Sequence, residues 1–280
     1  MRKVILLAVA TIATIPVEAH GQAWRSVAMS RQLDGNDELD VQVQYGAGRV
    51  TLRSVDEGLL YRMNLDYDEE RFEPVAEFTG NRLVLGVDSR GRSTRITNRG
   101  SGKLELELAR GVPMDLDLSF GAVKADIDLA GLALTGLELS TGASQSSISI
   151  SEPNPLTMRA ASFEAGAADF TVTTLGNLNA ERIDIEAGVG SVVLGFGGRW
   201  RRDARVGIDM GLGSLELRVP EGLGIRLRKD SFLTALDSEG LIKRGDVYES
   251  PDYDDAAYRI EIDLNAAFGS VSVVWIGADN

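Results

Sequence analysis

A tryptophan and four arginines stand together in residues 197–205, which read Gly-Gly-Arg-Trp-Arg-Arg-Asp-Ala-Arg. Both residue types are common at binding hot spots because each combines a large contact area with directed hydrogen-bond donors. We therefore expect an exposed recognition patch made of Arg199, Trp200, Arg201, Arg202 and Arg205. The alternative is that the tryptophan packs over a corner of the fold while the arginines pair with acidic neighbours.

Two acidic segments, Asp66–Glu70 and Asp252–Asp255, could each offer three or more carboxylates to calcium. Neither segment has the glycine-punctuated spacing of a calcium-binding loop such as an EF-hand. The sequence therefore predicts solvated acidic loops, no metal site and no cofactor.

The only histidine is His20, and the chain has no cysteine. If the first residues are removed on export, the mature chain lacks both residue types. That composition excludes serine-histidine and cysteine-histidine nucleophiles, histidine-bound zinc, disulfides and redox thiols. We expect a protein that is not an enzyme, although paired carboxylates of the glycosidase type are not excluded and no pair is singled out.

The first residues are typical of a secretory signal peptide. Arg2 and Lys3 precede an apolar stretch over residues 4–15, and Gly21-Gln-Ala23 fits a small-x-small cleavage site. We expect cleavage after Ala23, which places the mature protein in the periplasm or outside the cell. The alternative, a permanent anchor, would need roughly 20 apolar residues to span a bilayer, and no later segment is long and apolar enough either.

The net charge of −13 bears on partners. An acidic chain repels polyanions, so nucleic acid is not an expected partner.

The chain repeats a unit in which alternating apolar residues meet a glycine and then alternate again. Examples are residues 116–127, 183–194 and 206–217, and the first glycines step by 24, 22 and 23 residues from Gly142 to Gly166, Gly188 and Gly211. A constant step of this size is typical of stacked repeats.

The apolar residues before and after each glycine have opposite parity. Ile183 and Ile185 are followed by Val192 and Leu194, so the chain must turn a corner at the glycine to keep both sets on one side. The pattern predicts an all-β fold, a single-stranded β-solenoid (β-helix-like) with rungs of about 22 residues cornered at glycine. A meander of hairpins is the alternative.

No linker divides the chain, so we expect one solenoid domain over residues 24–276 after a signal peptide of residues 1–23. Residues 56–113 read as a wider β insertion or cap after the first rung. Residues 220–258 read as a connection to the last rung.

The rungs resemble those of the bacterial toast-rack families, which include LiaF-like, cell-wall-active antibiotic response and adhesin-like envelope proteins. The likeness rests on Tyr45–Val50, Gly111–Leu116, Leu129–Leu132 and Phe268–Val273. It implies a β-solenoid in the cell envelope and brings no catalytic residues. LiaF-like proteins join such a domain to transmembrane helices and modulate envelope-stress signalling, whereas this chain shows a leader.

These observations favour a secreted or periplasmic binding scaffold, in which the rung faces and the Trp200 segment contact an envelope protein or a cell-wall or surface polymer. Exposed terminal rungs would also allow self-association through strand edges. The alternatives are a polysaccharide-active β-helix enzyme, by analogy of fold alone, and an adhesin-like structural protein.

Overall fold

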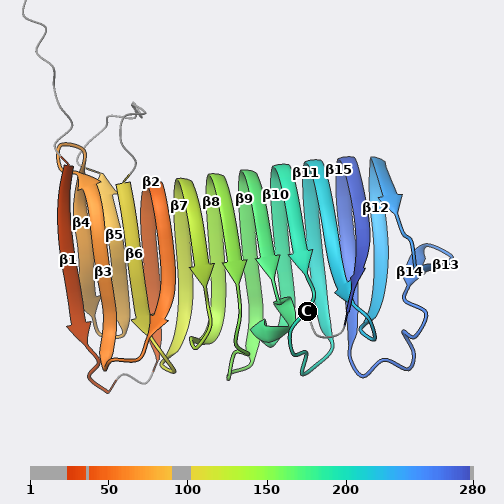
Figure 1. Ribbon diagram of the computed structural model, residues 1–280, viewed down its shortest axis with the longest axis horizontal. Helices are drawn as coiled ribbons and strands as arrows, with labels where there is room; N and C mark the ends of the chain where they lie inside the picture. The colour runs from red at the N-terminus through yellow and green to blue at the C-terminus, as the bar shows by residue number, and fades with distance from the viewer. Residues whose placement is uncertain (1–23, 36–37, 90–101, 278–280) are drawn as a thin grey trace, which may run out of the picture.

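The computed structural model describes residues 24–35, 38–89 and 102–277, without the side chains of residues 231–233. The predicted signal peptide lies outside these residues. Within them, the strands join in one 15-stranded sheet, and the other regular element is a short 3₁₀ helix, η1 (Leu175–Leu178). The strands stand side by side along one long axis (Figure 1), and the predicted all-β solenoid is confirmed.

Seven long strands of 16 to 18 residues form the body of the molecule. They are β2 (Leu39–Val55), β7 (Pro113–Asp128), β8 (Ala133–Ser149), β9 (Met158–Thr173), β10 (Ala180–Gly195), β11 (Ala204–Pro220) and β15 (Arg259–Ile276). Neighbouring long strands pair in parallel, for example β10 with β11, which excludes the hairpin meander. Figure 1 shows each ribbon turning over at the upper edge.

The turn lies at the repeated glycines, and burial follows the parity expected from the sequence. In β10, Ile183, Ile185 and Ala187 are buried before Gly188, and Val192 and Leu194 are buried after it. The two strands predicted for each rung are therefore two halves of one bent strand, and both halves point their apolar residues into the same core.

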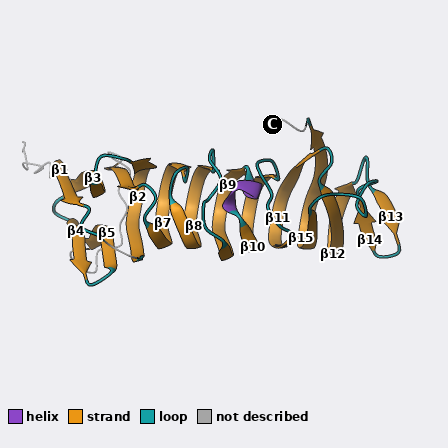
Figure 2. Ribbon diagram, turned by 90° about the horizontal axis from the view of Figure 1, so that it is seen from below, coloured by secondary structure: helices purple, strands orange, loops and turns teal. Residues whose placement is uncertain are grey.

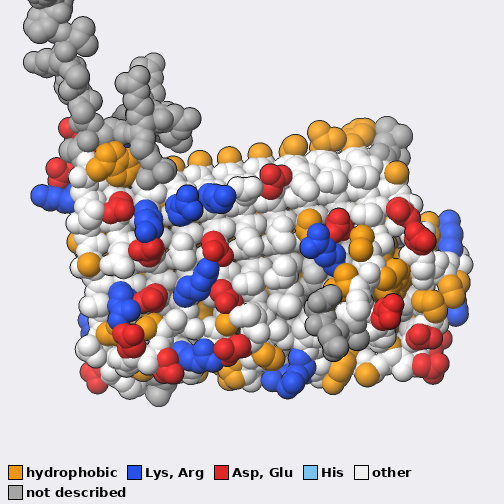
Figure 3. Space-filling view, in the orientation of Figure 1, with side chains coloured by type: hydrophobic (Ala, Val, Ile, Leu, Met, Phe, Trp, Pro, Cys, Tyr) orange, Lys and Arg blue, Asp and Glu red, His pale blue; other side chains and the backbone are white. Residues whose placement is uncertain are grey.

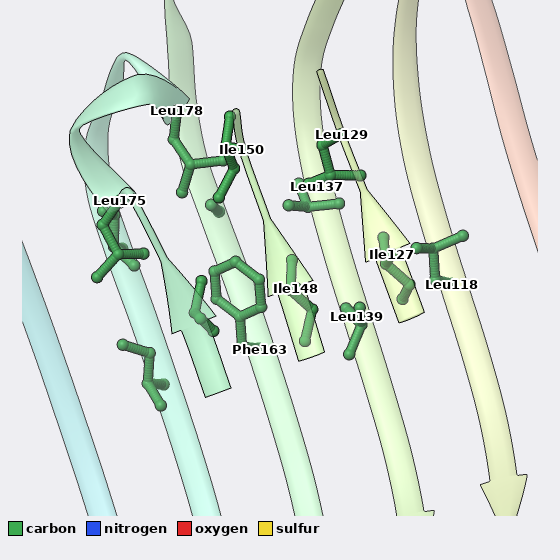
Figure 4. Close-up of a cluster of buried hydrophobic side chains, with 14 of the residues drawn as sticks. Leu118, Ile127, Leu129, Leu137, Leu139, Ile148, Ile150, Phe163, Leu175 and Leu178 are labelled. Atoms are coloured by element: carbon green, nitrogen blue, oxygen red, sulfur yellow. The ribbon is translucent and has the colours of Figure 1, made fainter. Parts of the chain in front are cut away.

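Return segments close the core between one long strand and the next. Side chains from the strands and from these segments point toward one another in Figure 4. Phe163 and Phe170 of β9 meet edge to face with ring centroids 6.0 Å apart. Fully burying one such apolar side chain contributes about 1.5–3 kcal/mol. The returns are fixed by asparagines, since the Asn154 amide donates to the carbonyls of Leu134 and Leu178 at 2.9 and 3.1 Å.

At the N-terminal end the sheet divides in two. The first half of β2 pairs with β5 (Arg82–Ser89), which pairs with β4 (Phe72–Thr79). The second half of β2 pairs with β6 (Gly102–Ala109), followed by β3 (Leu59–Asp68) and β1 (Trp24–Gln32). Figure 2 shows β4 and β5 on one side of this end and β1 and β3 on the other. Residues 56–113 therefore supply strands to both faces.

At the C-terminal end, the strands do not follow chain order. The strand β15 lies between β11 and β12 (Gly224–Asp237) and pairs in parallel with both. Two short strands, β13 (Ile242–Arg244) and β14 (Val247–Glu249), pair with each other, and β14 pairs with residues 226–228 of β12. Residues 220–258, which the sequence suggests are a connection, thus contain the outermost long strand.

Candidate functional site

A groove of about 1240 Å³ runs across the long strands on the side that leads into the corners. It is lined by three consecutive residues from each of several strands, such as Glu164–Gly166 of β9 and Glu186–Gly188 of β10. Phe72 of β4 and Val87 of β5 line its N-terminal end. We call this surface the corner groove.

In most of these sets the third residue is glycine, whereas in β15 it is Ala267. An added Cβ at Gly188 would lie 2.4 Å from the carbonyl oxygen of Gly166 on the preceding strand, and one at Gly211 would lie 2.4 Å from that of Gly188. Real Cβ atoms do not approach backbone this closely. Glycine at these two positions therefore allows β9, β10 and β11 to stack tightly where they turn.

The register between strands places one polar position of each rung in a line along the groove. From N- to C-terminal rungs, the line reads Gln44, Ser119, Ser140, Glu164, Glu186, Asp209, Asn265 and Asp230. Adjacent positions are separated by one strand spacing, about 4.8 Å. We call Glu164, Glu186 and Asp209, on three neighbouring strands, the carboxylate row.

The carboxylate row has hydrogen-bond donors but no cationic partner in the described part of the chain. Ser140 Oγ lies 3.3 Å from Glu164 Oε2, and Asn265 Nδ2 donates to Asp209 Oδ1 at 2.8 Å. Asp184, two residues before Glu186, is instead paired with Arg182 at 2.7 Å. The charges in the groove are therefore left for solvent or a ligand.

An apolar line, which we call the corner ridge, flanks the groove beyond the glycines. In register it reads Ala47, Ala122, Ala143, Ala167, Val189, Leu212 and Phe268. Val189, Leu212 and Phe268 are 52%, 51% and 46% exposed. Figure 3 shows hydrophobic side chains in a line along the upper edge of the molecule, where the strands turn.

The chemistry of the corner groove is that of a binding surface. None of its described lining residues is histidine, cysteine, lysine or arginine. At its N-terminal end, burial and then the charge of Asp66 raise the pKa of the Tyr45 hydroxyl, so this group stays protonated. The groove can accept hydrogen bonds, attract cations and contact apolar groups.

The structure corrects the expectation that Trp200 is exposed. Its side chain is 7% exposed, its ring stacks on that of Phe196 with centroids 6.4 Å apart, and its Nε1 donates to the Phe196 carbonyl at 2.7 Å. The tryptophan packs inside a return segment, as in the alternative interpretation, because an indole can bury its ring once its N–H has an acceptor.

The four arginines around Trp200 remain at the surface with different partners. Arg202 reaches Glu181 at 3.0 Å and Thr157 at 2.8 Å, and Arg201 reaches the Asn154 carbonyl at 3.4 Å. Arg205, with a side chain 80% exposed, lies 3.4 Å from Glu261. The backbone N–H of Arg199 donates to the Asn177 side chain at 2.7 Å. A binding role for these arginines stays a prediction.

The two acidic segments are built into local structure. Asp66 accepts from Ser26 at 2.5 Å, and Glu69 pairs with Arg25 at 3.2 Å. Tyr253 is buried beneath the Arg226 guanidinium, 4.3 Å from its ring centre. Over residues 24–35, 38–89 and 102–277, no group of three or more histidine, cysteine or acidic side chains is placed to hold a metal ion.

The corner groove was not predicted from the sequence, although a signal was present. Glu164 and Glu186 both precede an Ala-Gly pair, and Asp209 precedes Met-Gly. Aligning the repeats on their glycines would have placed the three carboxylates in one row.

In the described chain no helix has the length and apolar character needed to cross a bilayer.

Residues 20–173 match the family model described as the N-terminal domain of toast_rack, DUF2154. No curated protein matches the chain. Among solved structures, a proposed cell adhesion protein from Clostridium sporogenes is 16% identical with a TM-score of 0.46, over 90% of this chain and 100% of that one. A proposed adhesin from Bacteroides fragilis is 11% identical with a TM-score of 0.35, over 90% and 97%.

Proposed function

The chain belongs to the family of the N-terminal toast_rack domain, and from this premise we propose that it is a non-enzymatic binding scaffold of the cell envelope. In this proposal the protein is exported by the leader of residues 1–23 and holds an elongated partner, an envelope protein or a surface polymer. A role in envelope-stress signalling or in adhesion would use the same binding surface.

The observation that carries this proposal is the continuity of the corner groove across parallel strands in register. Each groove position repeats on the next strand, and every long strand has backbone partners along its length. Such a surface loses little conformational entropy when a partner binds, because it is already ordered. It therefore suits a long ligand that lies across the strands.

A polysaccharide-active enzyme is the competing function, since carboxylates stand on neighbouring strands about 4.8 Å apart. Glycosidases place their two carboxyl groups on either side of the scissile bond. Glu186 and Asp209 instead lie in one line on one wall of the groove. We expect no turnover on a panel of acidic and neutral glycans, and turnover abolished by Glu186→Gln would overturn the non-enzymatic proposal.

The test of the binding role is a cross-linking pull-down from the native envelope with the full chain. The groove variant is Glu186→Arg with Asp209→Arg, and the matched control is Glu138→Arg with Asp169→Arg, which changes net charge equally at exposed sites outside the groove. We expect the first pair to lose a component that the control retains. No retained component, or equal loss from both, would contradict the proposal.

Arg205→Glu in the same experiment tests the arginine segment. Loss of the partner in this variant alone would move the binding surface from the corner groove to residues 199–205. Retention at the level of the unchanged protein is the result that the groove predicts.

A further inference from the structure

The corner groove and the corner ridge lie next to each other where the strands turn, and both contain apolar side chains. The buried residues Ala165, Ala187 and Met210 line the groove, and Val189 and Leu212 rise beside it across a row of glycines. Val189 and Leu212 each stand on the same strand as one member of the carboxylate row, Glu186 and Asp209, three residues away. Polar and apolar recognition are thus available together on β10 and β11.

Both features strengthen in the same direction along the axis. In β7 and β8 the polar line consists of Ser119 and Ser140 and the ridge consists of alanines. In β10 and β11 the line becomes Glu186 and Asp209, while the ridge becomes valine and leucine. The polar line becomes acidic at Glu164 in β9 and the ridge gains a larger side chain at Val189 in β10, so both changes fall between β8 and β10.

We propose that the C-terminal half of the corner groove, from β9 to β15, binds a lysine- or arginine-rich polypeptide segment that also carries apolar side chains. This inference rests on the proposed binding role and names the chemistry of the partner. The carboxylate row supplies the charge complementarity, and the ridge and groove floor supply the apolar contact.

The dimensions suit a short segment. The four strands β9, β10, β11 and β15, at a spacing of about 4.8 Å, cover roughly 15 Å, which an extended chain of about four or five residues spans. Lysine and arginine reach through long flexible stems, so their charges can meet carboxylates without matching the strand spacing, while the stems lie on apolar surface. Anionic lipid and nucleic acid would be repelled by the same row.

The experiment measures binding of two fluorescent peptides of about ten residues to the full chain, one alternating lysine and leucine and the other lysine and serine. Glu186→Gln with Asp209→Asn should weaken binding of the lysine–leucine peptide about tenfold or more at low salt, because two of the three row charges are lost. The matched control, Glu138→Gln with Asp169→Asn, should change it less than about twofold. Raising the salt should weaken binding to the unchanged protein.

A second set of variants in the same experiment tests the contribution of the corner ridge. Leu212→Ser should weaken binding of the lysine–leucine peptide about fivefold and leave the lysine–serine peptide unchanged. Val274→Ser, at an exposed apolar position outside the ridge, should affect neither peptide. Circular dichroism of each variant shows whether the fold is kept.

Equal weakening by the groove and control pairs would overturn the inference, because the effect would then be one of net charge. Binding to anionic vesicles instead of peptide, or a dimer that Leu212→Ser dissociates, would assign the surface to lipid or to a second copy and overturn it as well. The peptides could fail to bind while the groove variant still loses an envelope component in the pull-down. That result would support the binding role of the groove and reject a lysine- or arginine-rich polypeptide as its partner.

Discussion

Two kinds of corner occur along the same solenoid. In β7, β8 and β9 the position two residues after the corner glycine is Val123, Ser144 or Ala168, whereas β10 and β11 carry Gly190 and Gly213 with φ of 143° and 145°. A second glycine removes the neighbour on the other side of the ridge residue, so a valine or leucine there stands clear of its own strand. β2 also has a glycine with positive φ at this position, Gly48, but its ridge residue is alanine. The second glycine therefore does not by itself determine the size of the ridge side chain.

The largest test of this comparison is Gly213→Ala. Its φ is rarely adopted by residues with a Cβ, and the new Cβ would lie 1.8 Å from the Gly190 carbonyl oxygen. We expect a loss of about 3 kcal/mol in unfolding free energy, from backbone strain and overpacking together. Ser144→Ala at the same position of β8 loses only the hydrogen bond between Ser144 Oγ and Thr141 Oγ1 and should cost about 1 kcal/mol or less. Thermal unfolding followed by circular dichroism measures both, and equal losses would remove the distinction between the corners.

Inside the core, β8 also differs from β9 and β10, because it carries Ser146 where they carry apolar residues. Its side chain is buried, its Oγ has no hydrogen-bond partner in the described chain, and its row continues as Phe170 in β9 and Val192 in β10. Ser146→Ala should raise the free energy of unfolding by about 1 kcal/mol, because an unsatisfied buried hydroxyl is removed. Ser147→Ala, on the outward face, should have no effect in the same urea titration. A loss at Ser146 would show that the hydroxyl is satisfied.

The carboxylate row should reduce stability when no ligand is present. Like charges directly opposite each other on neighbouring strands are destabilising, so Glu186→Gln should raise the free energy of unfolding by about 0.5 kcal/mol at low salt. The gain should vanish in about 1 M salt, where screening is nearly complete. Asp184→Asn removes the pairing with Arg182 and should give no gain. A gain of the same size in both variants would contradict a special role of the row.

The smallest effect is expected in the N-terminal half, at Asp115. Burial, followed by the charges of Asp40, Glu38 and Asp117, raises the pKa of this carboxyl above its ordinary value. The native state then holds the proton more tightly than the unfolded chain does. The resulting stability is fully present below the unfolded pKa of about 3.9 and is lost as pH rises through the folded pKa.

Asp115→Asn should therefore be slightly more stable than the unchanged protein at pH 7, and this advantage should shrink as the pH falls toward about 3.9. Urea midpoints at the two pH values measure it. An advantage that grows on acidification would show that the carboxylate is stabilised in the native state.

The repeat itself could be predicted from the sequence because its signal is local. Side chains alternate with a period of two, and a glycine that reverses parity can be recognised within one rung, as at Gly188. The long-range arrangement could not, because the pattern of β15 suits pairing with either β11 or β12 and does not indicate that it pairs with both. The division of the sheet around β2 could not be predicted either, because the pattern of β2 does not indicate that its two halves pair with different strands.

At the candidate site, residue types alone led to a wrong prediction for Trp200, because its exposure depends on the residues packed around it. Arginines on both sides of Trp200 suggested exposure, but the indole found an acceptor and a stacking partner four residues earlier in Phe196. Glu186 is not singled out in the sequence analysis. Its alignment with Glu164 and Asp209 depends on strand register, which one rung does not specify.

The position of β15 between β11 and β12 affects the order in which the strands can assemble during folding. If folding proceeds from the N-terminal end, the rungs from β7 to β11 can add one after another, each onto an existing edge. β12 comes next but has no long neighbour until residues 259–276 arrive to fill the space beside it. The open edge of β11 therefore stays uncovered until the final strand is in place, longer than the edges of β7 to β10, each of which is covered by the next long strand in the chain.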